Sequence, residues 1–244
     1  MKWSSYARVY DLMASNNPAY QDLVSQFVSQ LSAWSFAPND LLVDLGAGTG
    51  NFSIELAAAF PHCTVLHIDS DPIMNQIARW KAEKRSIQNI NIIQQDVSDY
   101  KFDPESVALF TCIHSLYTFN EPFSILNTMF YSLKPGGFAY ICDIGRVLDI
   151  HDWATYLFKH IASERGFLYA VWLFIKGREV TKQNRQAVSL QKSGAFWTHT
   201  HAEFCDTLKS SSFDILKSYE TYRGYSDIAI CRKLAYTEID RKKV

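Results

Sequence analysis

The chain has 244 residues, of which 48% are hydrophobic, and a formal net charge of -1 at pH 7. This length is enough for one large α/β domain with a well-packed core, or for one domain with an insertion. A nearly neutral chain offers no basic field to a phosphate backbone, so the charge argues against a nucleic acid partner. The five cysteines are widely spaced and lie mostly in apolar patterns, which predicts reduced core residues in a cytoplasmic protein. No apolar run is long enough to span a bilayer, so we expect no stable membrane insertion.

The first 36 residues show the spacing of amphipathic helices. Tyr6 and Tyr10 are one helical turn apart, which places them on the same face. The run Asn16-Asn17-Pro18 interrupts this spacing and predicts a break between two helices. We therefore expect a helical cap over residues 1–36.

The segment LLVDLGAGTGNFS, residues 41–53, is the central feature of the sequence. Its apolar start predicts a short buried strand, and Gly46, Gly48 and Gly50 end that strand before a helical pattern begins. Glycines permit positive φ and the close approach of a ligand, to which the N–H groups of the helix start point. The spacing differs from the G-x-G-x-x-G of dinucleotide folds and from a phosphate loop. We expect a nucleotide-type cradle that does not hold pyrophosphate, which also disfavours a nicotinamide dehydrogenase.

Later apolar segments continue the strand pattern, at residues 65–69, 90–96, 107–112 and 138–143. The first of them ends in Asp69, where a carboxylate can accept hydrogen bonds from both hydroxyls of a ribose. The second ends in Asp96. Asp71 and Pro72 predict a helix start between the two, with Asp71 as N-cap. The run L-K-P-G-G at residues 133–137 predicts the turn into the last of these strands.

These motifs, in this order over residues 41–143, resemble the class I S-adenosylmethionine-dependent methyltransferases of the small-molecule type. The resemblance implies a Rossmann-like three-layer α/β/α sandwich whose mostly parallel, seven-stranded sheet has the order 3-2-1-4-5-7-6. It also implies S-adenosyl-L-methionine as cofactor and S-adenosyl-L-homocysteine as product. The resemblance further implies that the following residues bind the cofactor: Asp44, Gly46, Ala47, Gly48, Gly50, Asp69, Ser70, Met74, Asp96, Val97 and Cys112.

A long stretch without a sheet pattern follows the fifth strand, so we expect a helical insertion over residues 147–197. Its many aromatic side chains fit a lid over a substrate pocket, additional core, or a helix on a membrane surface. They fit a subunit interface as well, so a homodimer stays open. Together with the Y-x-x-x-Y-D segment of similar enzymes, these features give the candidate substrate-binding residues Tyr10, Tyr117, Trp153, Trp172 and His201.

The closing segment contains a capping box, in which Thr200 and Glu203 start a helix. Two alternating strands then flank Arg223-Gly224-Tyr225, as at the end of the family's fold, and a charged tail is expected to fray. We therefore expect one methyltransferase domain over residues 1–244. Its predicted parts are the cap at 1–36, a cofactor-binding core at 37–146, the lid at 147–197, and the terminal helix and hairpin at 198–235.

Methyl transfer from a sulfonium is an in-line displacement, so the protein must align an acceptor lone pair and, where needed, remove a proton. The reaction requires no metal, and no adjacent pair of acids follows the fifth strand, so we predict none. Histidines are the candidate bases because their pKa lies near working pH. His114, at the tip of the fourth strand, and His199, before the terminal helix, are the catalytic candidates.

The predicted substrate is a small, partly aromatic or apolar metabolite that accepts the methyl group on oxygen or an amine. The tip of the fourth strand lacks the N/D-P-P-Y/F motif of similar enzymes that methylate adenine N6 or glutamine amides. A protein or RNA methyltransferase is the alternative enzyme. A catalytically silent scaffold is a third alternative, against which the intact glycines, Asp69 and Asp96 argue.

Overall fold

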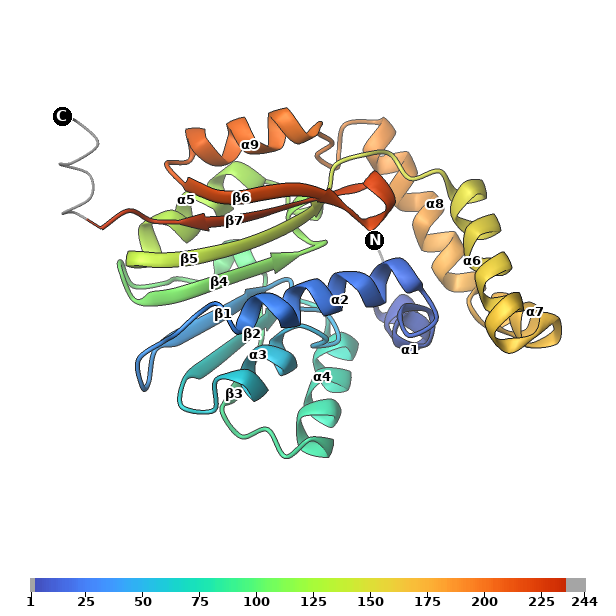
Figure 1. The fold of residues 1–244 in the computed structure, drawn as a ribbon, viewed down its shortest axis with the longest axis horizontal. Helices are drawn as coiled ribbons and strands as arrows, with labels where there is room; N and C mark the ends of the chain where they lie inside the picture. Colours follow the sequence, from blue (N-terminus) through green and yellow to red (C-terminus); the bar gives the residue numbers. More distant parts are fainter. Residues whose placement is uncertain (1–2, 236–244) are drawn as a thin grey trace.

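The computed structural model describes residues 3–235, apart from the side chains of residues 3–6 and 8. It shows one seven-stranded sheet with the order β3-β2-β1-β4-β5-β7-β6 (Figure 1). The strands are β1 (Leu41–Leu45), β2 (Thr64–Asp69), β3 (Ile90–Gln94), β4 (Val107–Ile113), β5 (Leu133–Ile144), β6 (Asp214–Thr221) and β7 (Ser226–Arg232). β1 to β5 pair in parallel, whereas β7 is antiparallel to both β5 and β6. The predicted fold class and strand order are confirmed.

Helices cover both faces of this sheet. They are α1 (Trp3–Ala14), α2 (Pro18–Leu31), α3 (Ser53–Ala59), α4 (Pro72–Lys84), α5 (Pro122–Ser132), α6 (Ile150–Arg165), α7 (Phe167–Lys176), α8 (Arg178–Lys192) and α9 (His201–Ser210). Short 3-10 turns occur at η1 (Val97–Asp99), η2 (Leu116–Thr118) and η3 (Tyr222–Gly224).

The two layers of the core follow from strand alternation, because neighbouring strand residues point to opposite faces. Leu42 and Tyr140 pack on one face with side chains of α2 and α3. Val43 and Ile141, each the next residue along, pack on the other face with side chains of α5 and α9. The central strand β4 is buried over its whole length, as expected for a parallel strand covered on both sides.

Local signals fix several helix starts where the sequence predicts them. Asn17 caps α2, with Pro18 as its first residue. Asp71 caps α4 by accepting hydrogen bonds from the N–H groups of Ile73 and Met74. Thr200 and Glu203 form the predicted capping box of α9. These predictions are confirmed.

Within residues 147–197 the chain forms α6, α7 and α8, which meet at Gly166 and Gly177. Together with α1 they lie beyond the carboxyl ends of the parallel strands, at the opposite end of the molecule from the end of β7 (Figure 1). They are thus placed where ligands bind in open α/β sheets. The division of residues 1–244 into a single domain of four parts stays a prediction.

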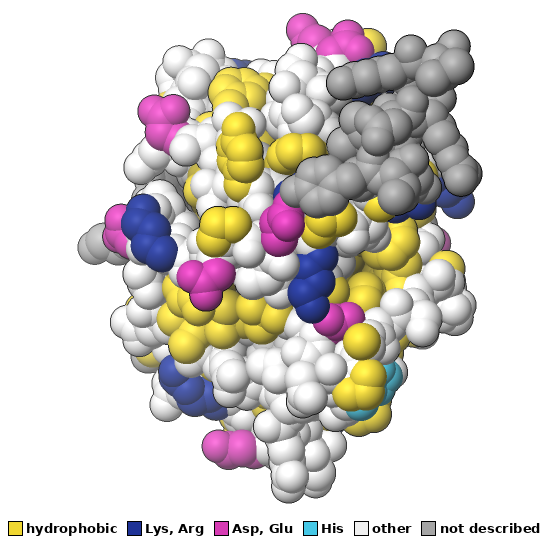
Figure 2. All heavy atoms as spheres, turned by 90° about the vertical axis from the view of Figure 1, so that its left-hand side faces the viewer, with side chains coloured by type: hydrophobic (Ala, Val, Ile, Leu, Met, Phe, Trp, Pro, Cys, Tyr) yellow, Lys and Arg dark blue, Asp and Glu magenta, His cyan; other side chains and the backbone are white. Residues whose placement is uncertain are grey.

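The face at the amino ends of the parallel strands is mixed in character. Acidic and basic side chains are interspersed there among hydrophobic ones (Figure 2). Within residues 3–235, none of the helices combines the length and hydropathy that crossing a membrane requires. The predicted fraying of residues 236–244 lies outside the described part of the chain.

Candidate active site

A cavity of about 530 Å³ opens at the carboxyl ends of the parallel strands. One part of its wall consists of the ends of β1, β2 and β3 with Met74 of α4. The other part includes α1, the end of β4, η2 and the helices α6 to α8, with Tyr20 of α2 and Tyr222 of η3. We refer to these as the strand-end half and the helical half. The predicted cofactor residues that line the strand-end half are Gly46, Ala47, Gly48, Asp69, Ser70, Met74, Asp96 and Val97.

The turn after β1 has a shape that requires glycine at two positions. Gly46 has φ +62°, and a Cβ on it would lie 2.6 Å from the Cβ of Ser115. Gly48 has φ +57°, and a Cβ on it would meet no protein atom within 4 Å, while the residue itself lines the cavity. A side chain would therefore be strained at both positions and would occupy cavity space at Gly48.

The Asp69 carboxylate is oriented by two backbone N–H groups. Gly48 donates to its Oδ2 over 2.9 Å and Asp71 donates to its Oδ1 over 2.8 Å. Burial raises the pKa of Asp69, and the two backbone hydrogen bonds oppose that rise. Each carboxylate oxygen has a second lone pair, so the group can still accept from a ligand hydroxyl.

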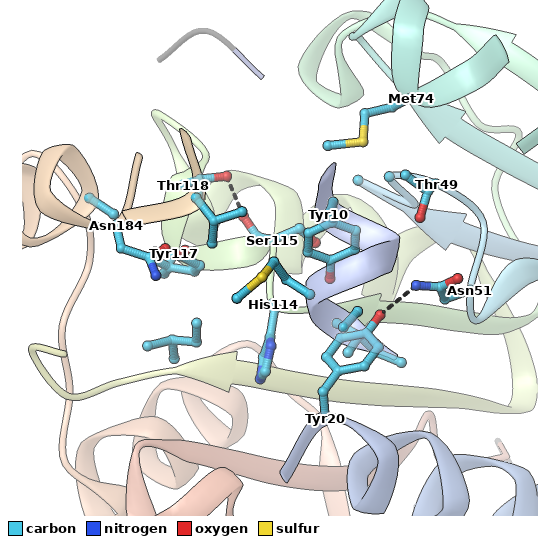
Figure 3. A pocket seen from close by; sticks show the side chains of 18 of the residues that line it. Tyr10, Tyr20, Thr49, Asn51, Met74, His114, Ser115, Tyr117, Thr118 and Asn184 are labelled. Carbon is cyan, nitrogen blue, oxygen red and sulfur yellow. Dashed lines mark hydrogen bonds between the residues drawn. The ribbon is translucent and has the colours of Figure 1, made fainter. Parts of the chain in front are cut away.

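α1 is fastened to the glycine turn by a cluster of polar side chains. Asp11 accepts from the Thr49 hydroxyl over 2.7 Å and pairs with Lys81 Nζ over 2.7 Å. Lys81 also donates to Asn51 Oδ1, and Asn51 in turn donates to the Tyr20 hydroxyl over 3.0 Å (Figure 3). This cluster holds α1 over the cavity, where Tyr10 and Met13 line it.

The helical half of the cavity is mainly apolar. Its lining includes Met13, Tyr117, Ile144, Leu148, Trp153, Leu157, Phe174, Val180 and Ala187. Neutral polar side chains accompany them: His114, Ser115, Thr118 and Asn120 at and after the end of β4, and Thr181 and Asn184 on α8. Figure 3 shows Asn184 near Tyr117 and Thr118. Asp69 and Asp96 are the Asp or Glu side chains that the described part of the chain contributes to the whole cavity, and it contributes neither Lys nor Arg. Both acids lie in the strand-end half, so the described residues of the helical half contribute no Asp, Glu, Lys or Arg side chain to the cavity.

His114 lines the cavity in an unusual backbone conformation. Its φ is +53°, which is uncommon for a residue with a Cβ, and its ring is hydrogen-bonded through Nε2 to the Ser226 hydroxyl at 2.9 Å. Burial lowers the pKa of His114 to about 3, so the ring is neutral near pH 7. A neutral ring with so low a pKa is a weak base but an effective hydrogen-bonding group.

Three of the predicted cofactor residues lie behind the cavity wall instead of in it. Asp44 is buried and accepts from the Thr111 hydroxyl over 2.7 Å; burial raises its pKa to about 7. Cys112 lies 3.2 Å from the Ser115 hydroxyl, and Gly50 faces Ala78 and Ile54. In this structure Asp44, Gly50 and Cys112 therefore support the turn and the tip of β4 and do not line the cavity.

The structure does not bring His199 to the cavity. Its side chain is fully buried, with Nδ1 3.4 Å from Asp227 Oδ2 and Nε2 3.9 Å from Asp143 Oδ2. Burial opposes a charge on the ring, but the two carboxylates outweigh it and raise the pKa of His199. A base must reach the proton that it removes, so the expected direct role of His199 is corrected to one in a buried ion cluster.

Two predicted substrate-binding residues, His201 and Trp172, also lie outside the cavity. His201 donates or accepts through Nδ1 at 2.8 Å from Asp227 Oδ1, in the same cluster as His199. Trp172 is 44% exposed on the outer side of α7. Its spacing on the helix, four residues from Leu168, places it on the outward face. The remaining predicted substrate residues, Tyr10, Tyr117 and Trp153, do line the cavity.

The sequence does not single out Tyr20 and Asn184, which line the cavity, or Asp11, which connects α1 to the glycine turn. Asp11 follows Tyr10 directly in the Y-x-x-x-Y-D segment, so that motif carried a usable signal. Tyr20 and Asn184 occupy ordinary helical positions, and nothing local distinguishes them before the helices are placed in space. In residues 3–235 we find no group of three or more His, Cys, Asp or Glu side chains arranged to hold a metal ion. The absence of a metal in the reaction stays a prediction.

Comparisons with known proteins agree with this geometry. A family model described as a methyltransferase domain matches residues 42–137. A carboxy-S-adenosyl-L-methionine synthase from Ruthia magnifica is 26% identical over 137 residues, 55% of this chain and 57% of that protein. A demethylmenaquinone methyltransferase from Clavibacter sepedonicus is 31% identical over 102 residues, 42% and 40% of the two chains. Release factor glutamine methyltransferase from Escherichia coli matches over 55 residues.

Solved structures extend the likeness to most of the chain. Magnesium protoporphyrin IX methyltransferase from Synechocystis, solved with S-adenosylhomocysteine, superposes with a TM-score of 0.59 at 19% identity, over 88% of this chain and 83% of that one. Residues 42–137 therefore match a methyltransferase domain, and the described chain has the class I fold of S-adenosylmethionine-dependent methyltransferases. The chain spans about half the length of the curated relatives it matches.

Proposed function

We propose that this protein transfers the methyl group of S-adenosylmethionine to an oxygen or amine of a small, uncharged, largely apolar molecule. The observation that carries the proposal is the division of the cavity into two chemically different halves. Asp69 and Asp96 lie at the strand ends, whereas apolar and neutral polar side chains line the helical half. A charged substrate would lose its hydration there without gaining an ionic partner.

The strand-end half is the proposed cofactor site. Asp69 would accept from the ribose hydroxyls, Asp96 and Val97 would contact the adenine, and the backbone of Gly48 leaves the space that the ligand requires. S-adenosylmethionine supplies an electrophilic methyl group on sulfur. The two carboxylates in this half are compatible with its sulfonium charge, because opposite charges attract more strongly in a partly buried site than in water.

The chain's own contribution to the reaction is alignment and exclusion of water. We propose that α1 and the helices α6 to α8 enclose the acceptor, with Tyr10 and Tyr117 among the side chains that line the cavity. His114 would orient the acceptor by a hydrogen bond and would not remove its proton, because its pKa is lowered to about 3. Precise placement of a nucleophile behind the methyl group is by itself a large source of rate enhancement.

The named alternatives fit the cavity less well. Carboxy-S-adenosyl-L-methionine, which the name of one relative mentions, would call for a cationic partner to its additional carboxylate, and the described cavity residues provide none. RNA would call for Lys or Arg along its phosphates. A silent scaffold does not explain a glycine turn and an oriented carboxylate that leave a cavity open between them.

The test is to follow where the methyl group goes. The protein is incubated with methyl-labelled S-adenosylmethionine and a total extract of the source cells, which is then separated into protein, RNA and organic-extractable fractions. The proposal expects the label in the organic-extractable fraction, and label confined to protein or RNA would contradict it. A reaction with the Asp69→Asn protein identifies transfer that does not depend on this cavity.

A further inference from the structure

α7 is apolar on every side, and one of its sides is uncovered. Ala170 and Leu173 on its inward face are completely buried, and Phe174 lines the cavity. Its outward face exposes four large hydrophobic side chains: Phe167 at 64%, Leu168 at 82%, Trp172 at 44% and Ile175 at 63%. A helix that is hydrophobic all round is ordinarily buried in a protein or in lipid. The outward face of α7, defined by these four residues, therefore requires a covering.

The charges around α7 are unlike those of the rest of the chain. Arg165 precedes the helix, and Lys176 and Arg178 lie at its other end, with Glu164 and Glu179 as the neighbouring acids. Residues 150–192 contain seven Lys and Arg against three Asp and Glu, which gives a net charge of +4. The rest of the chain then carries -5, because the whole chain carries -1. The surface that covers α7 should accordingly be apolar with a negative rim.

The uncovered helix is also the outer wall of the active-site cavity. Trp153 and Leu157 of α6 and Phe174 of α7 line the cavity from within. In Figure 1 α6, α7 and α8 form the end of the molecule that projects beyond the carboxyl ends of the parallel strands. At the other end, acidic and basic side chains are interspersed (Figure 2). A flat surface could therefore approach α7 without meeting the sheet.

We propose that the outward face of α7 docks on the surface of a membrane that contains anionic lipids. Leu168, Ile175 and their neighbours would enter the boundary between headgroups and acyl chains, and the basic side chains at both ends of α7 would contact the headgroups. A ten-residue helix of about 15 Å can lie in this boundary but cannot cross the bilayer. A second copy of the chain is a poorer occupant, because it would bring two positively charged surfaces together.

Docking places the wall of an apolar cavity against the lipid. An uncharged, lipid-soluble substrate would then enter the cavity from the membrane past α6 and α7. This step rests on the function proposed above. Docking itself does not depend on that function, so the two can be tested separately.

Co-sedimentation with vesicles tests the docking. The full chain is mixed with vesicles of phosphatidylcholine alone, or of phosphatidylcholine with about 30% phosphatidylglycerol. We expect binding to the anionic vesicles that weakens at least about fivefold when salt is raised to about 0.5 M, because salt screens the basic residues. The Leu168→Ser/Ile175→Ser variant should bind these vesicles at least about tenfold more weakly, because two exposed apolar side chains are removed.

The matched control is Leu216→Ser, which removes a leucine that is 49% exposed on β6. Its vesicle binding should equal that of the unmodified protein. Far-ultraviolet circular dichroism of all three proteins shows whether each is folded, and titration with S-adenosylhomocysteine reports separately on the proposed cofactor site. Absence of vesicle binding by folded protein would overturn the proposal, as would equal binding by the double variant. A dimer in solution that only the Leu168→Ser/Ile175→Ser change dissociates, without vesicle binding, would assign the face to a second copy instead.

Discussion

Asp69 and Asn184 are the residues through which the two halves of the cavity are expected to recognise their ligands. Asp69 is held by two backbone N–H groups and keeps acceptor capacity for a hydroxyl. Asn184 places an amide on the cavity side of α8, between Val180 and Ala187. A neutral amide in an apolar wall orients a neutral polar group at little cost in desolvation.

Asn184→Leu is therefore expected to impair substrate recognition and to leave cofactor binding unchanged. The variant keeps the volume of the side chain and removes its hydrogen-bonding groups, which should raise the KM for the methyl acceptor about tenfold. The dissociation constant for S-adenosylhomocysteine should not change. The matched control is Gln186→Leu, which makes a similar change at an exposed position on α8. An unchanged KM for Asn184→Leu would remove this residue from the substrate site.

The buried cluster around His199 predicts a pH dependence of stability. The folded state raises the pKa of His199 above its unfolded value, so its stabilising contribution is complete below about pH 6.5 and is lost as the pH rises through the folded pKa. The destabilisation caused by His199→Gln, about 2 kcal/mol for a lost charged hydrogen bond, should consequently be larger at about pH 6 than at about pH 9. Urea unfolding at both pH values measures it. His62→Gln, at an exposed surface position, is the control, and an equal difference at both pH values would show that His199 is not charged in the folded protein.

At the scale of elements, α1 depends on a few polar contacts for its place above the cavity. Asp11 connects it to Thr49 in the glycine turn and to Lys81 of α4. Such a contact, about one-third exposed, contributes about 1 kcal/mol. α1 can therefore move without unfolding the sheet.

Asp11→Asn should loosen α1 and weaken cofactor binding. The change removes the ion pair with Lys81, so we expect about a fivefold weaker affinity for S-adenosylhomocysteine and faster hydrogen exchange in residues 3–14. Asp22→Asn on α2, where the carboxylate accepts from Gln26, is the matched control. Unchanged exchange in α1 would mean that apolar packing alone holds the helix.

The elements differ in how far the sequence predicts them. β1, the glycine turn and the caps at Asp71 and Thr200 are determined by local residue types, and all of them are found as predicted. The placement of α6 to α8 depends on contacts distant in sequence. Periodicity indicated aromatic helices there, but it could not show that Trp153 faces the cavity while Trp172 faces away.

Contacts between segments far apart in the chain also explain why the expected roles of His114 and His199 differ from what the structure shows. The sequence predicts a catalytic role for His114 from its place at the tip of the fourth strand, and for His199 from its place before the terminal helix, close to the insertion. Their surroundings come from distant strands: Ser226 and the hydrophobic interior at His114, Asp143 and Asp227 at His199. Burial and carboxylate neighbours shift the two pKa values in opposite directions, and neither neighbour set can be read from local sequence.

The chain as a whole combines a negatively charged sheet body with a positively charged helical end that contains the cavity. We infer that the cavity takes two ligands, one in each half. The cofactor would bind at the strand ends, and an uncharged substrate would bind between the helices. The proposed cofactor and substrate positions both depend on the strand-end half being a cofactor site.

The most direct test of that claim is calorimetric titration with S-adenosylhomocysteine of the unmodified protein and of Asp69→Asn, with Asp99→Asn, on the exposed turn η1, as control. We predict a dissociation constant of about 1 μM for the unmodified protein and the control. Asp69→Asn should bind at least about tenfold more weakly, because it loses a charged acceptor for the ribose hydroxyls. Folded protein that binds no S-adenosylhomocysteine, or an Asp69→Asn variant that binds it equally well, would contradict the account.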